Sequence, residues 1–493
     1  MEYSANAKNN SATGLLIILG ILIFSYTVIR AFLLAITWDE AYTYLEFVRN
    51  GKFIPDKFDQ MSANNHLLNT WLDIFFVKCF GVNEFVLRLP SLFGHLLFLF
   101  YSAKLVTNFE NKGIIFCSFF ILNVNPYMLD YFSLSRGYGL SWGLMMTSVY
   151  YLFLFQSKGY RKLFAIISIV LAALATLANF VLLNYCLALY GFITILICYK
   201  YFNSEGARSN KIFKIIKELL VPSIIIIIFL GIIVPFLFHF KQAGTLFWGG
   251  QKSFWTDSIS ETINRNLYEL KFNLFIHWLL KAFMLFVVLA GCIFIGHKYF
   301  KTRATIDNLF VAALITLIGF IVLSTTLQYY LIDTPYLTDR TAMFIVILFN
   351  LLFVVLINEF SKEKPKAVFL IYSAAGLLFF HFAYSSNLKY VLDWKFDADT
   401  KGVIAELENQ RPLNELKSNQ TIGTHYLYSP SLDFYRATNK IDWITCDIFD
   451  DSTISKYDYI YLSLADFERI NNDNLTEIKI FPITKSILAK VNF

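Results

Sequence analysis

The chain has 493 residues, of which 57% are hydrophobic and only 16% are charged. A soluble globular protein averages about 25% charged residues, so this composition excludes an ordinary soluble protein and indicates a polytopic membrane protein. The net charge of +6 is small for the length, and we expect a lipid bilayer around the chain and no nucleic-acid partner.

Eleven apolar segments are long enough to be membrane spans, because about 20 helical residues at 1.5 Å each cross a hydrocarbon core of about 30 Å. We therefore predict an all-α polytopic membrane fold with about eleven transmembrane helices. The predicted spans are 14–36, 88–107, 113–131, 137–156, 163–181, 183–200, 218–239, 275–296, 308–327, 341–359 and 367–385.

The basic residues predict the topology. They gather in the loops 158–162, 200–217, 298–303 and 362–366, which all fall on one side of the membrane if the N-terminus is cytoplasmic. An odd number of spans then places the C-terminal tail outside the cytoplasm. Because frequent Asn, Lys, Phe and Ile residues indicate an AT-rich bacterial genome, the expected location is a bacterial inner (cytoplasmic) membrane.

The tail has the composition of a soluble unit from about residue 400 onward. A helical stretch at 400–410 precedes a short helical run at 429–435 and several β-rich runs, and this alternation predicts a small α/β domain. We expect a transmembrane domain at 1–390 and an extracytoplasmic α/β domain at 391–493. The predicted strands are 421–426, 441–446, 457–462 and 477–481.

Acidic residues mark the expected outer face. Asp39 and Glu40 follow the first span directly and open a long polar loop, 37–87. Carboxylates at a membrane boundary are costly to desolvate, so they tend to mark a pathway, a proton acceptor or a cation site. The alternative is that the two carboxylates only mark the boundary between membrane and water and have no chemical role. A further carboxylate, Asp130, ends the third span on the same side, either as part of the site or as an ion pair with Arg136.

The order of these elements is similar to a known family. After the acidic pair come a polar element at Asn65-His66 and the segment GVNEFVLRLPS, from Gly81 to Ser91, which opens the second span. This pattern resembles the class C glycosyltransferases, in particular the branch of the protein O-mannosyltransferases and lipid A aminoarabinose transferases. The resemblance covers roughly residues 14–385. Relatives usually carry Pro-Pro after the basic residue of the polar element, whereas this chain has Leu67-Leu68.

The resemblance implies a multi-span fold, a polyprenyl-phosphate-linked sugar donor on the outer side, and a catalytic acidic residue that maps onto Asp39. Such a reaction needs a carboxylate to accept the acceptor's proton and cations to stabilise the departing phosphate. We expect Asp39 to be the general base, with Glu40 and Asp130 as supporting catalytic residues. By ligand chemistry, these three carboxylates could also hold a Mg²⁺ or Mn²⁺ ion, while no organic cofactor is predicted.

Five residues are candidates for substrate binding. Arg136 and Arg340 would hold the donor phosphate because guanidinium groups bind phosphate oxygens in pairs, with Arg30 as a weaker candidate. The alternative for Arg340 is an ordinary interfacial anchor, and for Arg88 a structural contact to Glu84. The full set of predicted binding residues is His66, Arg136, Tyr138, Lys252 and Arg340, with Lys252 in the aromatic segment 247–257.

The most direct functional interpretation is an inverting membrane glycosyltransferase that acts on a glycolipid, polysaccharide or protein acceptor. One alternative is a carrier or flippase of lipid-linked sugars, which would favour broken helices and two similar halves. Polar residues instead cluster at one face, and no half-repeat is visible. A structural or sensory membrane protein would leave the acidic loop and the arginine segments without a role.

Overall fold

A computed structural model describes residues 2–54, 62, 64–203, 207–245, 248–302, 310–411, 420–470 and 474–492. Phe247 of the aromatic segment and Arg303 of the third basic loop lie outside these ranges.

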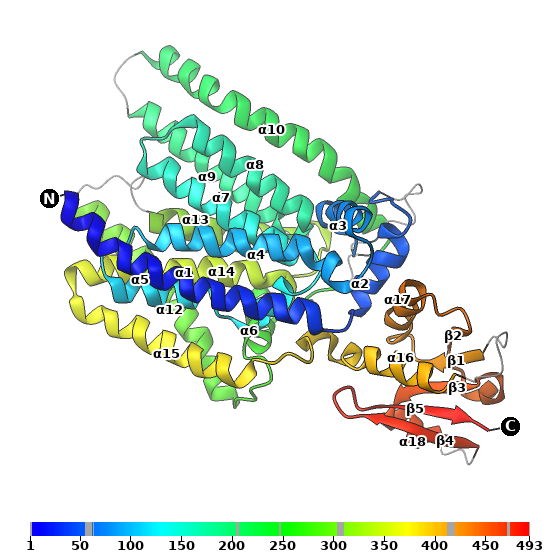
Figure 1. Ribbon diagram of the computed structural model, residues 1–493. Helices are drawn as coiled ribbons and strands as arrows, with labels where there is room; N and C mark the ends of the chain where they lie inside the picture. Colours follow the sequence, from blue (N-terminus) through cyan, green and yellow to red (C-terminus); the bar gives the residue numbers. More distant parts are fainter. Residues whose placement is uncertain are drawn as a thin grey trace.

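Long helices form most of the molecule and run alongside one another in a bundle (Figure 1). The longer ones are α1 (Glu2–Leu33), α4 (Glu84–Val106), α7 (Tyr138–Ser157), α8 (Lys162–Ala178), α9 (Leu183–Phe202), α10 (Arg208–Gln242), α12 (Leu274–Thr302), α13 (Phe310–Ile332), α14 (Asp339–Glu363) and α15 (Val368–Ser385). Shorter helices connect them: α2 (Trp38–Thr43), α3 (Leu67–Phe80), α5 (Lys112–Asn123), α6 (Pro126–Phe132) and α11 (Ser260–Asn266).

The polytopic helical fold class is confirmed. Among the described residues, eight helices are long and apolar enough to cross a membrane: α1, α4, α9, α10, α12, α13, α14 and α15. The predicted span 113–131 is a pair, α5 and α6, bent by 62°, and would be a ninth span. The predicted span 163–181 corresponds to α8, an apolar helix of only 17 residues. The total of eleven spans therefore stays a prediction.

Close backbone contact joins α4 and α7 at the centre of the bundle. A Cβ atom on Gly94 would lie 2.4 Å from the carbonyl oxygen of Gly139, and one on Gly143 would lie 2.1 Å from the carbonyl oxygen of Gly94. Such distances leave no room for a methyl group, so glycine is required for the two backbones to meet. This crossing packs the start of α7, two to three residues after Arg136, against the middle of α4.

The C-terminal segment forms the predicted α/β unit. Its five-stranded sheet has the order β2-β1-β3-β5-β4, with β1 parallel to β2 and β3, and with β5 antiparallel to β3 and β4. The last strand, β5, was not predicted, because its run of Ile, Leu and Ala is equally compatible with a helix. The elements are α16 (Thr400–Asn409), β1 (Gln420–Thr424), α17 (Ser429–Asn439), β2 (Ile444–Ile448), β3 (Tyr459–Ser463), α18 (Leu464–Ile470), β4 (Leu475–Phe481) and β5 (Ser486–Val491).

This unit packs against the loop 37–87 at one end of the helix bundle, where α17 lies beside α2 (Figure 1). The two parts share one hydrophobic core, in which Ala41 and Tyr44 of the loop join Leu432 and Phe434 of α17. The rings of Tyr44 and Phe434 meet edge to face, with centroids 5.1 Å apart. The C-terminal unit therefore shares buried apolar surface with the segment that carries the acidic pair.

Substituting Gly94 tests the α4–α7 crossing. We expect Gly94→Ala to lower the stability of the detergent-solubilised protein by about 1–3 kcal/mol, because the added methyl overpacks the contact. The matched control is Gly191→Ala on α9, where nothing lies within 4 Å of the added Cβ. Thermal unfolding should show a lower midpoint for Gly94→Ala only, and equal midpoints for the two variants would contradict the packing argument.

Candidate active site

Glu40 is buried in a full set of hydrogen bonds. Arg88 donates to both carboxylate oxygens, from Nε at 2.9 Å and from Nη2 at 2.8 Å. Oε1 also accepts the amide of Ser135 at 2.7 Å, and Oε2 accepts the amide of Thr37 at 3.0 Å. Neither side chain of the Glu40–Arg88 pair is exposed. Both oxygens of Glu40 are thus occupied by the protein itself.

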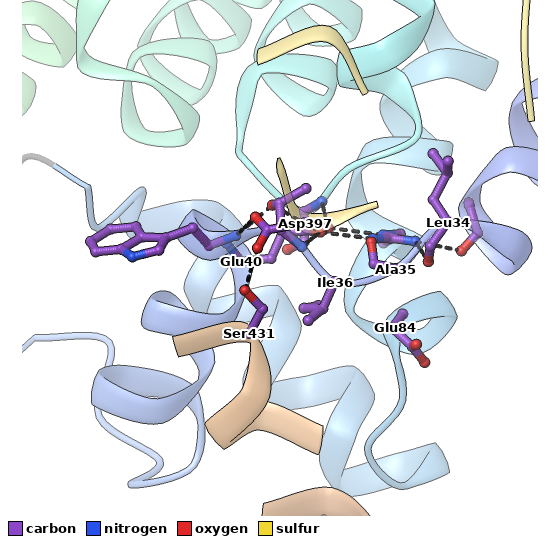
Figure 2. Close-up of polar contacts among 12 residues, drawn as sticks. Leu34, Ala35, Ile36, Glu40, Glu84, Asp397 and Ser431 are labelled. Carbon is purple, nitrogen blue, oxygen red and sulfur yellow. Dashed lines mark hydrogen bonds and ion pairs between the residues drawn. The ribbon is translucent and has the colours of Figure 1, made fainter. Parts of the chain in front are cut away.

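The same pair closes the end of the first helix. Thr37 caps α2 and forms a reciprocal capping box with Glu40. Arg88 also donates to three carbonyl oxygens at the end of α1, those of Ala31, Leu34 and Ala35, at 2.8–3.0 Å (Figure 2). The carbonyl of Ala31 belongs to the last turn of α1, and those of Leu34 and Ala35 follow its last residue, Leu33, so Arg88 binds carbonyls that have no intrahelical partner. The geometry therefore gives Glu40 a structural role.

The predicted contact between Arg88 and Glu84 is replaced by other pairs. Glu84 is 3.0 Å from the ammonium of Lys401 and accepts the hydroxyl of Tyr435 at 2.7 Å. Both partners belong to the C-terminal segment, which no local sequence pattern could indicate.

Asp39 faces a different arginine. Its Oδ2 lies 2.9 Å from Nη2 of Arg136 as an ion pair, yet this buried oxygen accepts no aligned hydrogen bond from the residues that the structure describes. The other oxygen, Oδ1, accepts a long hydrogen bond of 3.4 Å from the side-chain amide of Asn64. The side chain of Asp39 is 11% exposed, in contrast to the enclosed Glu40. Of the predicted acidic pair, Asp39 is the residue with hydrogen-bonding capacity left for a ligand.

The loop before α7 presents Arg136 to this position. Arg136 also donates to the side-chain oxygen of Asn64 and, at 3.3 Å, to the Asn64 carbonyl oxygen. The next residue, Gly137, has φ = 68°, and a Cβ there would lie 2.2 Å from the carbonyl oxygen of Ala178. Only glycine fits this left-handed, crowded position. The Arg-Gly sequence thus turns the chain so that Arg136 reaches the first loop.

His66 and Tyr138 lie beside this arginine. Their rings meet edge to face, with centroids 5.5 Å apart, and both residues are buried. Within the described ranges, neither ring nitrogen of His66 has a hydrogen-bond partner. Burial, together with the charges of Arg136 and Arg340, holds the pKa of His66 well below its usual value. His66 is therefore a neutral ring with two unused nitrogens.

Asp130 belongs to a separate network. It forms a buried ion pair with Arg30, accepts the hydroxyl of Tyr268 at 2.9 Å and accepts the amide of Leu392 at 2.9 Å. The alternative expected from the sequence, an ion pair with Arg136, is wrong, because Arg136 pairs with Asp39 instead. Arg30 is likewise a buried partner of this network, 1% exposed, and no surface anchor.

Each predicted catalytic carboxylate thus has its own arginine: Asp39 has Arg136, Glu40 has Arg88 and Asp130 has Arg30. Within the described part of the chain, no group of three His, Cys, Asp or Glu side chains is arranged to hold a metal ion. The three carboxylates do not form the shared Mg²⁺ or Mn²⁺ site considered from the sequence, and no chemical step is assigned to a cation.

A second cationic cluster surrounds Asp393. Its Oδ1 lies 3.1 Å from Arg265, and its Oδ2 lies 3.9 Å from Arg340. The guanidinium of Arg340 lies over the rings of Trp248 and Trp394, at 5.4 and 5.2 Å from their centroids. The side chains of Arg265 and Arg340 are 38% and 21% exposed, so both can meet a ligand. Sequence reasoning missed Arg265, which sits in no recognisable motif.

Lys252 is exposed, and its backbone amide donates to Asp257 at 2.6 Å. The adjacent Gly250 exchanges two backbone hydrogen bonds of 2.9 Å with Tyr336, just before α14. This pairing holds the aromatic segment beside Arg340, which contacts it through Trp248.

The architecture has a counterpart among solved structures. The crystal structure of ArnT from Cupriavidus metallidurans bound to undecaprenyl phosphate matches with a TM-score of 0.50 and 11% identity, over 96% of this chain and 97% of that one. The chain has the ArnT fold. The apo state of the same ArnT gives a TM-score of 0.48 over 97% and 98% of the two chains, also at 11% identity.

An Archaeoglobus fulgidus oligosaccharyltransferase in complex with zinc and sulfate gives a TM-score of 0.42 at 10% identity, over 92% of this chain and 69% of that one. No protein-family model and no curated protein sequence matches the chain. The ArnT fold confirms the fold expected from the resemblance to the aminoarabinose transferase branch of the class C glycosyltransferases.

Removing Arg88 tests the structural role of Glu40. We expect Arg88→Met to lower the free energy of unfolding by about 3–5 kcal/mol, because it leaves a buried carboxylate without its partner. The double variant Arg88→Met/Glu40→Gln should recover part of the loss. Thermal unfolding in detergent measures the stability of the single variant and of the double variant.

The matched control for Arg88 is Arg469→Met, which breaks an ion pair with Asp451 whose partners are 66% and 56% exposed. Arg469→Met should lower the free energy of unfolding by less than about 1 kcal/mol. If Arg88→Met is no worse than this control, the Glu40–Arg88 pair does not stabilise the loop.

Proposed function

We propose that this chain is a membrane glycosyltransferase, which transfers a sugar from a polyprenyl-phosphate-linked donor to an acceptor on the outer side of a bacterial cytoplasmic membrane. The observation that supports it best is the state of Asp39, a carboxylate at the mouth of α1 that is held by Arg136 and retains an oxygen without an aligned hydrogen bond. The ArnT fold supports the class of donor, since that ArnT binds undecaprenyl phosphate.

In the proposed reaction Asp39 takes the proton from the acceptor hydroxyl or amine as the acceptor attacks the anomeric carbon of the donor. The bond between this carbon and the phosphate oxygen breaks, and its electron pair leaves with the polyprenyl phosphate. Attack from the side opposite the phosphate inverts the anomeric configuration. Arg136 fixes the orientation of the carboxylate, and the partly buried surroundings strengthen its effect on developing charge.

Arg340 and Arg265 are the proposed contacts for the departing phosphate. Arg340 has no carboxylate closer than 3.9 Å among its ion pairs in the described residues, so its N–H groups are available to an incoming anion. Arg265 forms an ion pair with Asp393, which also lies near Arg340, so a second guanidinium group is close to the proposed phosphate position. His66 and Tyr138 would line the donor side of Arg136.

Replacing the proposed base tests this function. We expect Asp39→Asn to lower sugar transfer from synthetic polyprenyl-phosphate donors by about 10²–10⁴-fold, the usual contribution of a general base, while donor binding is kept. Transfer of radiolabelled sugar by the purified protein measures it. The control is Asp451→Asn, a carboxylate that is 56% exposed.

Turnover that Asp39→Asn leaves unchanged would remove Asp39 from the mechanism. If no donor of a broad panel is turned over, with or without divalent cations, the carrier or flippase interpretation becomes the better one.

Loss of a phosphate contact should weaken donor binding. A hydrogen bond to a charged group contributes about 1.5–3 kcal/mol, so Arg340→Gln should raise the Kd for polyprenyl phosphate by about 10- to 100-fold. Titration of the purified variants with undecaprenyl phosphate in detergent gives the Kd. Lys252→Gln is measured in parallel, and an effect there would assign the phosphate to the aromatic segment, whereas an unchanged Kd in Arg340→Gln would contradict our assignment.

A further inference from the structure

A carboxyl group from the C-terminal segment lies directly behind the acidic pair. Asp397 ends the 3₁₀ helix Leu392–Asp397 and is 1% exposed. Its Oδ2 accepts the backbone amide of Trp38 at 2.6 Å, and its Oδ1 is hydrogen-bonded to the hydroxyl of Ser431 (Figure 2). The chain thus returns from beyond its last predicted span to the residue that precedes Asp39.

No cation balances this carboxyl group. Among the described residues, no Lys, Arg or His side chain forms an ion pair with Asp397, whereas Asp39, Glu40 and Asp130 each have an arginine. An ionised carboxylate buried without a partner is strongly unfavourable. Burial and the nearby charges of Asp39 and Glu40 raise the pKa of Asp397 well above its usual value. Burial without a counterion therefore favours the neutral form of this carboxyl group.

The other titratable groups that face Asp397 do not alter this conclusion. They are the phenols of Tyr428 and Tyr461, which lie near Asp397 in the C-terminal unit. Burial raises the pKa of Tyr428 to about 12, and that of Tyr461 also lies above its usual value. Both phenols are uncharged, so neither supplies a counterion. Asp397 accepts the amide of Trp38 with one oxygen and is hydrogen-bonded to the hydroxyl of Ser431 through the other, and a neutral acid keeps both contacts because a hydroxyl can donate or accept.

A second hydrogen bond holds the same turn. The backbone amide of Ile36 donates to the hydroxyl of Tyr435 at 2.9 Å, and this hydroxyl donates to Glu84. The amides on either side of the cap residue Thr37 are therefore both bound by C-terminal side chains. Amides at a helix start have no intrahelical partner, so these contacts decide the direction in which α2 leaves the first span.

We propose that Asp397 is a positioning residue, which acts as a neutral hydrogen-bonding acid to fix the first turn of α2 and thereby the orientation of Asp39 toward the acceptor. The C-terminal unit then supplies a residue that positions the catalytic carboxylate. This inference rests on the proposed role of Asp39 as the base.

Two substitutions at Asp397 separate positioning from charge. Asp397→Asn keeps one acceptor and one donor in nearly the same shape, whereas Asp397→Leu removes both and keeps a similar volume. Displacement of a reacting group by about 1 Å can cost about 100-fold in rate. We therefore expect Asp397→Leu to lower kcat by about 10- to 100-fold with the donor KM unchanged, and Asp397→Asn to retain most of the parent kcat.

The matched control lies in the same unit, away from the loop. Asp458→Leu removes a carboxylate that accepts the amide of Thr421 at 2.7 Å within the C-terminal sheet. This variant shows how a lower stability of the C-terminal unit affects sugar transfer. We expect its kcat to stay near the parent value. An equal loss in Asp458→Leu and Asp397→Leu would reduce Asp397 to a stability role and overturn the proposal.

Hydrogen–deuterium exchange provides a readout that needs no turnover. The peptide covering residues 36–41 should exchange faster in Asp397→Leu and at the parent rate in Asp397→Asn. Parent kcat and parent exchange in Asp397→Leu would refute the positioning contact, and an Asn variant as damaged as the Leu variant would refute the neutral acid. If the parent protein transfers no sugar, the proposed function fails, and exchange alone then supports or refutes the contact.

Discussion

The buried ion pair between Glu40 and Arg88 is the interaction on which the arrangement of the site depends. One guanidinium binds the last carbonyls of α1 and both oxygens of Glu40, and Glu40 binds the start of α2 and the amide of Ser135. Three chain segments thus meet at one charge pair. A buried pair of this kind contributes little net stability compared with an apolar replacement, but its many directional contacts define one geometry.

The three carboxylates of the site differ in their hydrogen bonding: Glu40 and Asp130 have a full set of partners, and Asp39 does not. Glu40 and Asp130 are enclosed with their arginines, and their remaining oxygen lone pairs meet backbone amides or a phenol. Asp39 has the poorest set of hydrogen bonds of the three. In an enclosed, low-dielectric environment a carboxylate with incomplete hydrogen bonding interacts strongly with an added donor. In the proposed mechanism, the small number of donors to Asp39 among the described residues leaves this carboxylate free to meet an incoming group.

Much of the architecture could be predicted because it depends on local composition. Apolar segments indicated the helical membrane fold, and alternating short runs indicated the C-terminal α/β unit. The structural role of Glu40 was also visible, since Thr37-x-x-Glu40 is a capping-box pattern, but the adjacent Asp39 favoured a shared chemical role for the pair. The pairing of arginines with carboxylates could not be predicted, because Arg30 meets Asp130 and Arg136 meets Asp39 across segments far apart in sequence. The contact of Asp397 with Trp38 could not be predicted either, because the two residues are 359 positions apart in sequence.

The contacts of Asp397 and Tyr435 with the turn at Ile36 to Trp38 also have a consequence for biosynthesis. The first span and its loop leave the ribosome early, whereas their partners lie 359 and 399 residues later in the chain. Domains generally form in the order in which they are synthesised. The acidic turn therefore lacks two of its hydrogen bonds until residues 397 and 435 have been synthesised. A nascent or truncated chain without these residues would leave the turn before Asp39 incompletely bound, so synthesis of the C-terminal unit completes the assembly of this turn.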